Sequence, residues 1–102
     1  MLEQIEAHRP DVAELCRRFH VRRLEVFGSA ARGTDFDPAR SDIDLLVAYD
    51  PALPPTFADY FDLRDRLERL FERPVDLVMS GAVRNPYFRA GIERSKELLY
   101  AA

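Results

Sequence analysis

The stretch Val26–Asp50, with the sequence VFGSAARGTDFDPARSDIDLLVAYD, decides the fold that we expect for this chain. A strand-forming run ends at the pair Gly28-Ser29, and a second run begins at Asp42 after a polar loop. The continuous apolar residues of the second run are typical of a buried strand. We therefore expect the turn and the start of the second strand to lie in one region of the fold.

The sequence on either side of this stretch has the periodicity of helices and of two further short strands. Thr56 and Asn85 are typical N-cap residues, and Pro10 and Pro86 suit a first helical position. The pattern predicts an α/β (α+β) fold in which helices pack on a small mixed sheet of three to four strands. The expected helices lie at about 2–8, 10–18, 30–32, 57–73 and 86–94, and the expected strands at 23–27, 42–49, 75–79 and 97–100.

Length and composition restrict the class of protein. The chain has 102 residues, 47% of them apolar, which suits one domain over 1–102 with its own core. The single cysteine excludes an internal disulfide, and no apolar run approaches the ~20 residues of a membrane span. The N-terminus lacks the pattern of a signal peptide, so we expect a cytoplasmic domain with no membrane partner. A net charge of −3 argues against direct binding of nucleic acid, which needs a basic surface.

Two aspartates occupy alternate positions where the second strand begins. Side chains alternate along a strand, so Asp42 and Asp44 are expected on one face while Ile43 faces apolar packing. Carboxylates this close repel each other unless a cation lies between them. Mg²⁺ prefers one or two carboxylates together with waters and substrate phosphates. The pair is therefore a candidate Mg²⁺ site.

The Gly28-Ser29 turn is a candidate phosphate site. Gly28 has no Cβ and lets the backbone approach a phosphate, while the Ser29 hydroxyl and the next amides can donate hydrogen bonds. Arg32 is a candidate to contact a phosphate or a partner, or to form a surface salt bridge. Ser41 is a candidate to contact the nucleotide or to cap the loop before Asp42. Phosphate donors beside a metal pair are what phosphoryl or nucleotidyl transfer requires.

A third carboxylate lies in the third expected strand. Asp76 is flanked by valine and leucine in a short apolar run. If this strand lies beside the second one, Asp76 faces the other two aspartates. Its expected role is to ligate one metal ion and to help deprotonate the attacking hydroxyl.

These motifs resemble those of the DNA polymerase β-type nucleotidyltransferase superfamily: GS at 28–29, SDIDL at 41–45 and VDL at 75–77. The run FGSAARG at 27–33 is similar to the minimal nucleotidyltransferase branch, and the resemblance covers nearly the whole chain. It implies a polymerase β-like fold in which the Gly-Ser turn holds the triphosphate of ATP. It also implies that Asp42 and Asp44 hold two Mg²⁺ ions and that Asp76 completes the site.

The resemblance extends to minimal members that are antitoxins paired with HEPN-domain ribonucleases. It implies an enzyme that transfers AMP from ATP to a tyrosine hydroxyl of such a toxin and silences it. The expected partners are therefore ATP and a HEPN-domain protein in a hetero-oligomer.

Other interpretations are compatible with parts of the pattern. A non-catalytic binding module could neutralise its partner by occupancy, with or without a nucleotide. Three retained aspartates favour the enzyme, because a pure binder does not need a costly carboxylate cluster. A nucleotidyltransferase for small molecules is disfavoured because no substrate domain is present. The aromatic residues of the long helix, Phe57, Tyr60, Phe61 and Phe71, are expected in the core and not at a cofactor.

Overall fold

A four-stranded mixed sheet forms the centre of the computed structural model, which describes residues 1–37 and 39–102. The strands are β1 (Val21–Phe27), β2 (Ile43–Tyr49), β3 (Val75–Met79) and β4 (Glu97–Ala101), in the sheet order β3-β2-β1-β4. Strand β1 pairs antiparallel with both β2 and β4, whereas β3 runs parallel to β2. The predicted fold class, a mixed sheet with helices packed on it, is confirmed.

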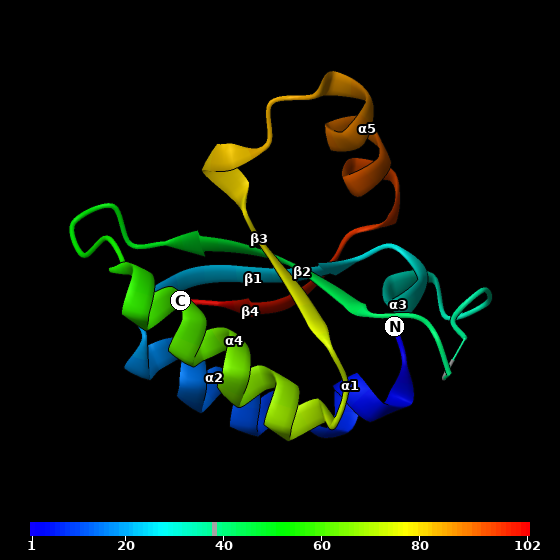
Figure 1. Cartoon of the computed structure of the whole chain (residues 1–102), viewed down its shortest axis with the longest axis horizontal. Coiled ribbons are helices and arrows are strands. Elements are labelled where there is room, and N and C mark those ends of the chain that lie inside the picture. The colour runs from blue at the N-terminus through cyan, green and yellow to red at the C-terminus, as the bar shows by residue number, and fades with distance from the viewer. Residues whose placement is uncertain (38) are drawn as a thin grey trace.

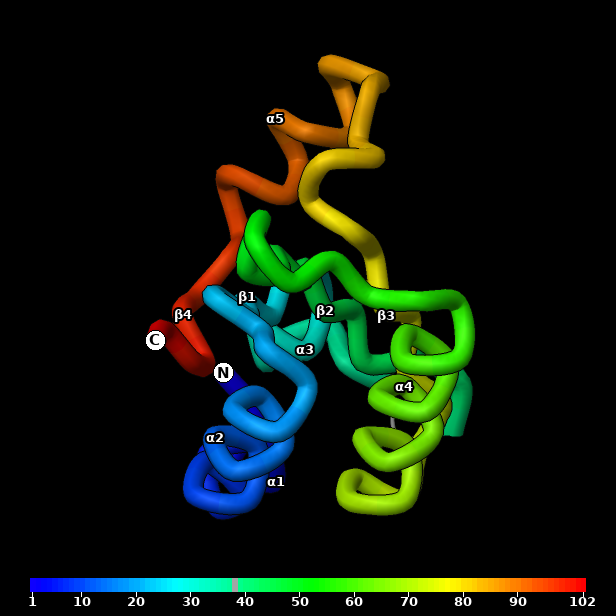
Figure 2. The backbone as a smooth tube through the Cα atoms, turned by 90° about the vertical axis from the view of Figure 1, so that its left-hand side faces the viewer, coloured from blue at the N-terminus to red at the C-terminus, as the bar shows by residue number. Residues whose placement is uncertain are grey.

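Helices lie on both faces of the sheet, but unequally. Figures 1 and 2 show α1 (Glu3–Ala7), α2 (Arg9–Arg18) and α4 (Phe57–Phe71) together on one face. On the opposite face, α5 (Pro86–Ser95) and the 3-10 turn η1 (Ser80–Ala82) form a smaller layer. The short helix α3 (Ser29–Arg32) follows β1 directly. We call the first face the core face and the second the site face.

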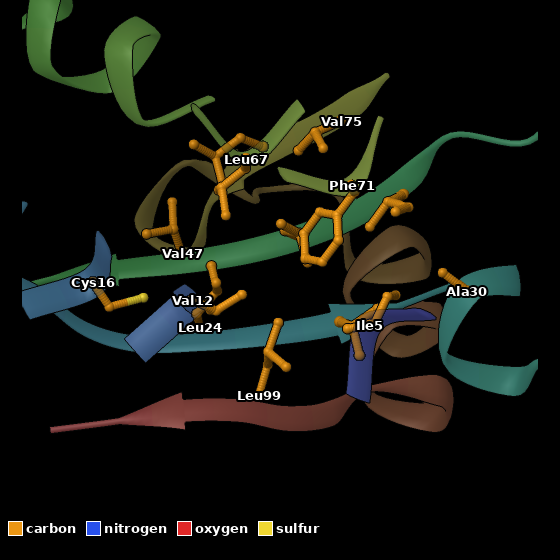
Figure 3. Close-up of a cluster of buried hydrophobic side chains, with 14 of the residues drawn as sticks. Ile5, Val12, Cys16, Leu24, Ala30, Val47, Leu67, Phe71, Val75 and Leu99 are labelled. Carbon is orange, nitrogen blue, oxygen red and sulfur yellow. The ribbon is translucent and has the colours of Figure 1, made fainter. Parts of the chain in front are cut away.

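The main hydrophobic core fills the space between the core face and its three helices. Inward residues of neighbouring strands, such as Leu24 and Val47, meet Leu67 and Phe71 of α4 (Figure 3). Cys16 of α2 is completely buried in this cluster, as its place on an apolar helix stripe predicts. A smaller cluster on the site face joins β1 and β2 to the η1–α5 layer; it consists of Phe27, Leu46, Val83 and Ile92.

Local signals set the helix ends as predicted. The Thr56 hydroxyl accepts a hydrogen bond from the Asp59 amide, and the Asp59 carboxylate accepts one from the Thr56 amide, which is a complete capping box. The Asn85 side chain accepts from the first amides of α5. His20 has the positive φ, 60°, expected where α2 gives way to β1.

Helix α4 also fixes the outer edge of β3. The Tyr60 hydroxyl donates to the carbonyl of Leu77, and the Glu68 carboxylate accepts a 2.9 Å hydrogen bond from the amide of Val75. Both groups would otherwise be exposed on an unpaired strand edge. The α4 side chains therefore hold the backbone on either side of Asp76.

Two expectations need correction. Strand β2 begins at Ile43, so Asp42 lies just before the strand. The expectation that all four aromatic residues of α4 are core was wrong for Phe57 and Phe61, which are 87% and 45% exposed. The buried stripe of α4 follows Leu63 and Phe71, and a helical spacing of 3.6 residues turns Phe57 and Phe61 away from it.

Within the residues that the structure describes, no helix combines the length and the apolar character that crossing a membrane requires.

Candidate functional site

The site is built around the turn that ends β1. Gly28 has φ 69° and ψ −150°, a combination that is essentially restricted to glycine. A Cβ placed on Gly28 would lie 2.7 Å from Oδ2 of Asp44. Glycine is therefore required here twice, for its backbone conformation and for the close approach of the Asp44 carboxylate.

Strand pairing brings the carboxylates together. Asp44 is the register partner of Phe27 on β1 and of Asp76 on β3, so Asp44 and Asp76 lie side by side on the site face. Asp42 precedes β2 by one residue, and its charge acts on Asp44. The condition on which the role of Asp76 depended, that the third strand lies beside the second, is met.

The pKa of Asp44 is shifted by burial and by the other carboxylates of this cluster. Partial burial, and then the negative charges of Asp76 and Asp42, raise the pKa of Asp44 to about 6. The positive charge of Arg32 opposes this shift. Asp42 and Asp76 are exposed, whereas Asp44 is half-buried, so Asp44 is the carboxylate whose charge most needs a nearby cation.

Helix α3 adds hydrogen-bond donors beside the carboxylates. Its first residue, Ser29, is half-buried, and the first amides of any helix lack intrahelical acceptors. Arg32 forms a two-pronged ion pair with Asp35, with nitrogen–oxygen distances of 2.7 and 3.1 Å. The surface salt bridge, one of the roles expected for Arg32, is thus present. The guanidinium is exposed, and its positive charge still acts on Asp44.

Ser41 forms hydrogen bonds with Asp37, within the loop that precedes Asp42. Its hydroxyl accepts a 2.9 Å hydrogen bond from the Asp37 amide, and its own amide donates to the Asp37 carbonyl. Of the two roles considered for Ser41, the capping role is the one seen in these contacts. The loop that Ser41 closes leads directly into Asp42.

The donor set suits a hard divalent cation that also binds phosphate. Carboxylate oxygens are the ligands that Mg²⁺ prefers, and a cation would relieve the repulsion that raises the pKa of Asp44. Over residues 1–37 and 39–102, no group of three or more histidine, cysteine, aspartate or glutamate side chains is arranged to hold a metal ion alone. A metal ion here would therefore need phosphate oxygens and waters as further ligands.

One residue of the site was missed at the sequence level. The Ser95 hydroxyl, at the end of α5, accepts a 3.0 Å hydrogen bond from the Gly28 amide and donates to the Gly91 carbonyl. The two residues joined by the first bond are 67 positions apart, and no local pattern connects them. Asp35, the partner of Arg32, lies three positions on but beyond the end of α3, so helical spacing does not predict the pair.

The Gly28 turn lies against Asp44, Asp76 lies beside Asp44, and the charge of Asp42 acts on it; this arrangement is typical of enzymes that transfer nucleotides. The chain belongs to the nucleotidyltransferase domain family, whose model matches residues 12–99. The prediction that it is a nucleotidyltransferase, an enzyme with a nucleotide substrate, is thereby confirmed.

Two relatives of this chain are named as protein adenylyltransferases. The chain is 36% identical over 88 residues to the protein adenylyltransferase MntA of Thermococcus cleftensis, covering 82% of each chain. It is 35% identical over 83 residues to a candidate protein adenylyltransferase of Methanocaldococcus jannaschii, MJ1379, covering 81% of this chain and 79% of the relative.

Solved structures confirm the fold. A candidate minimal nucleotidyltransferase superposes with a TM-score of 0.75 at 36% identity, over 93% of this chain and 92% of the other. A tri-AMPylated Shewanella oneidensis HEPN toxin in complex with its MNT antitoxin contains a chain that superposes with a TM-score of 0.68. That chain is 16% identical, with 96% of this chain and 73% of the other covered, and it shows the shared fold alone.

Proposed function

We propose that this protein transfers AMP from ATP, in a Mg²⁺-dependent reaction, to a tyrosine hydroxyl of a HEPN-type ribonuclease and so acts as its antitoxin. The observation that carries the proposal is the contact between the Gly28 turn and the Asp44 carboxylate, with Asp76 beside it. This contact joins a phosphate-type turn to a carboxylate cluster. The names of the relatives, protein adenylyltransferases and an antitoxin bound to an AMPylated HEPN toxin, support the acceptor.

Each site residue has a proposed role. Gly28, Ser29 and the first amides of α3 bind the phosphates of ATP, and Arg32 exchanges Asp35 for a phosphate oxygen. Asp42, Asp44 and Asp76 would hold Mg²⁺ only together with phosphate oxygens and waters. When bound, Mg²⁺ neutralises phosphate charge and orients the α-phosphate for attack. Ser41 holds the loop before Asp42 through its bond with the Asp37 amide.

The transfer itself is a substitution at phosphorus. The tyrosine oxygen bonds to the α-phosphorus, the bond between the α-phosphorus and its bridging oxygen to the β-phosphate breaks, and pyrophosphate leaves. Asp76 accepts the phenolic proton, directly or through one water. Because Asp42 and Asp76 are exposed, an acceptor carried by another protein can approach the site from solvent.

The experiment that tests the proposal is an intact-mass measurement of the partner. The protein that co-purifies with this chain is mixed with it, ATP and Mg²⁺, and the partner's mass and ribonuclease activity are recorded. We expect the mass of one or more AMP groups, localised to tyrosine, together with loss of ribonuclease activity. The matched control is the Asp42→Asn, Asp44→Asn chain, which should bind the partner and leave its mass unchanged.

A second candidate function is neutralisation by binding alone. It is favoured by an exposed apolar groove of about 730 Å³ between the loop after β2 and the end of β3, with Phe57, Phe61 and Met79 among its lining residues. Exposed apolar patches of this kind are typical of protein–protein contact. Inhibition of equal strength with no adenylate mass, by both the native chain and the double variant, would establish this function instead.

A further inference from the structure

An exposed aromatic side chain lies next to the site without belonging to it. Phe88, in the first turn of α5, is 47% exposed. Its ring packs edge-on against the ring of Phe27, with centroids 6.0 Å apart and planes at 77°. Phe27 is both the residue before Gly28 and the register partner of Asp44. Phe88 therefore contacts a residue that adjoins both the Gly28 turn and Asp44.

Hydrogen bonds hold α5 in a fixed place above the site face. The Arg89 guanidinium donates to the carbonyl of Val83 at 2.9 Å and to that of Ser80 at 3.3 Å, which fixes the start of the helix against η1. At the other end, Ser95 accepts the hydrogen bond from Gly28. The helix that carries Phe88 is thus tied directly to the Gly28 turn.

Packing alone does not account for the position of Phe88. The small cluster on the site face is already closed by Val83 and Ile92, which are 9% and 4% exposed. Phe88 adds an edge-on contact to this cluster and leaves about half of its surface in solvent. Among the other exposed aromatic side chains, Tyr87 of α5 is 86% exposed, whereas Phe57 and Phe61 belong to α4 on the core face.

We propose that Phe88 is the stacking surface for the base of the bound nucleotide. This inference rests on the proposed function, because it needs the triphosphate at Gly28-Ser29. With the phosphates there, the base must lie within the length of one nucleoside, and Phe88 is the exposed aromatic side chain in contact with the residue preceding Gly28. A ring that stacks on the base adds affinity without requiring hydrogen bonds to one particular base.

The proposal separates two contributions to affinity that can be measured apart. Loss of base–aromatic stacking weakens nucleotide affinity by about 5- to 150-fold. The proposed phosphate contacts are at Gly28 and Ser29 and do not involve Phe88. Phe88→Leu keeps an apolar side chain against Phe27 but removes the aromatic face. We expect it to weaken binding of Mg²⁺–ATP within that range and to leave binding of Mg²⁺–tripolyphosphate unchanged. Phe61→Leu changes an aromatic residue of similar exposure, 45%, in α4 on the core face, and it should alter neither affinity.

Fluorescence gives a direct readout. The chain has no tryptophan, so Phe88→Trp introduces one whose emission reports only on this position. We expect the emission to be quenched by Mg²⁺–ATP and unaffected by Mg²⁺–tripolyphosphate, with ATP affinity retained. Thermal unfolding of each variant verifies that it is folded.

The outcomes distinguish the two proposals. If the native chain binds neither Mg²⁺–ATP nor Mg²⁺–tripolyphosphate, the proposed function fails. If it binds both, and Phe88→Leu retains full ATP affinity or Phe88→Trp does not respond to ATP, the triphosphate site stands and the role of Phe88 is refuted.

Discussion

The two faces of the sheet differ in a way that separates stability from chemistry. On the core face, Ile43 and Leu45 are completely buried beneath helices. Between them in sequence, Asp44 turns to the site face, where it meets Asp76 and the Gly28 turn. A single strand thus contributes alternate residues to a closed hydrophobic core and to an open, charged site.

The site can contain groups that disfavour folding because the main hydrophobic core lies on the other face of the sheet. Three carboxylates and a glycine-only turn disfavour folding, but Asp44 and Asp76 project from the face opposite the main core. Changes on one face should therefore affect mainly stability, and changes on the other mainly transfer. The following predictions test that division, from the largest expected effect to the smallest.

The core face should dominate stability. Phe71 of α4 is completely buried, so Phe71→Ala should lower the free energy of unfolding by about 3–5 kcal/mol, as large-to-small changes in a core do. Urea denaturation gives this value directly. The transfer rate per folded molecule should stay near that of the native chain, and a specific loss of transfer in the folded fraction would show that the two faces are not independent.

The site face should dominate transfer. Asp76→Asn should reduce the transfer rate by about 10²–10⁴-fold, the usual contribution of general-base assistance. Stability should stay constant or rise, because a charge that repels Asp44 is removed. Asp62→Asn is the control: this carboxylate is on α4, pairs with Arg66 and should leave transfer unchanged. Normal transfer by a folded Asp76→Asn protein would exclude the catalytic role.

Two glycines with positive φ offer a sharper contrast. Gly28→Ala places a Cβ 2.7 Å from the Asp44 carboxylate, whereas Gly33→Ala, at φ 77°, meets nothing within 4 Å. Each change should cost about 1–3 kcal/mol of stability through backbone strain. Only Gly28→Ala should also weaken Mg²⁺–ATP binding, measured by calorimetry on the folded proteins. Equal ATP affinity for the two variants would remove the Gly28 turn from the nucleotide site.

The raised pKa of Asp44 predicts a smaller, pH-dependent effect. Its pKa is about 6 when folded and 3.8 ordinarily, so the folded state binds more protons between these values. Without metal, stability should therefore fall as the pH rises from about 4 to about 6, and level off above. In Asp44→Asn this part of the pH dependence should be absent. An unchanged profile, followed by thermal unfolding in a metal chelator, would contradict the desolvation and repulsion assigned to Asp44.

Much of the fold could be predicted because its signals are local. The capping residues Thr56 and Asn85 and the strand 75–79 follow from short patterns, and the structure has them as expected. The alternation that predicts Asp42 and Asp44 on one side is equally local, although the strand begins only at Ile43. The position of Asp76 beside Asp44 was only conditional, because parallel pairing depends on how α4 carries the chain back to the sheet.

Other parts of the site are not written in any short pattern. The bond between Gly28 and Ser95 depends on the path of α5 over the site face, and so does the contact of Phe88 with Phe27. The helical pattern predicts a buried Phe57, because aromatic residues in a helix usually face the core, whereas its side chain is 87% exposed. Such contacts are set by tertiary packing, which residue type and spacing do not determine.

The central claim is that the carboxylates and the Gly28 turn together bind Mg²⁺–ATP. Thermal unfolding with and without Mg²⁺–ATP tests it most directly, because a ligand that binds only the folded state stabilises it by about 2.7 kcal/mol at 100 times its Kd. We predict a clear rise in Tm for the native chain and none for the Asp42→Asn, Asp44→Asn protein, which should otherwise fold normally. A double variant that keeps the full Mg²⁺–ATP shift would contradict the account.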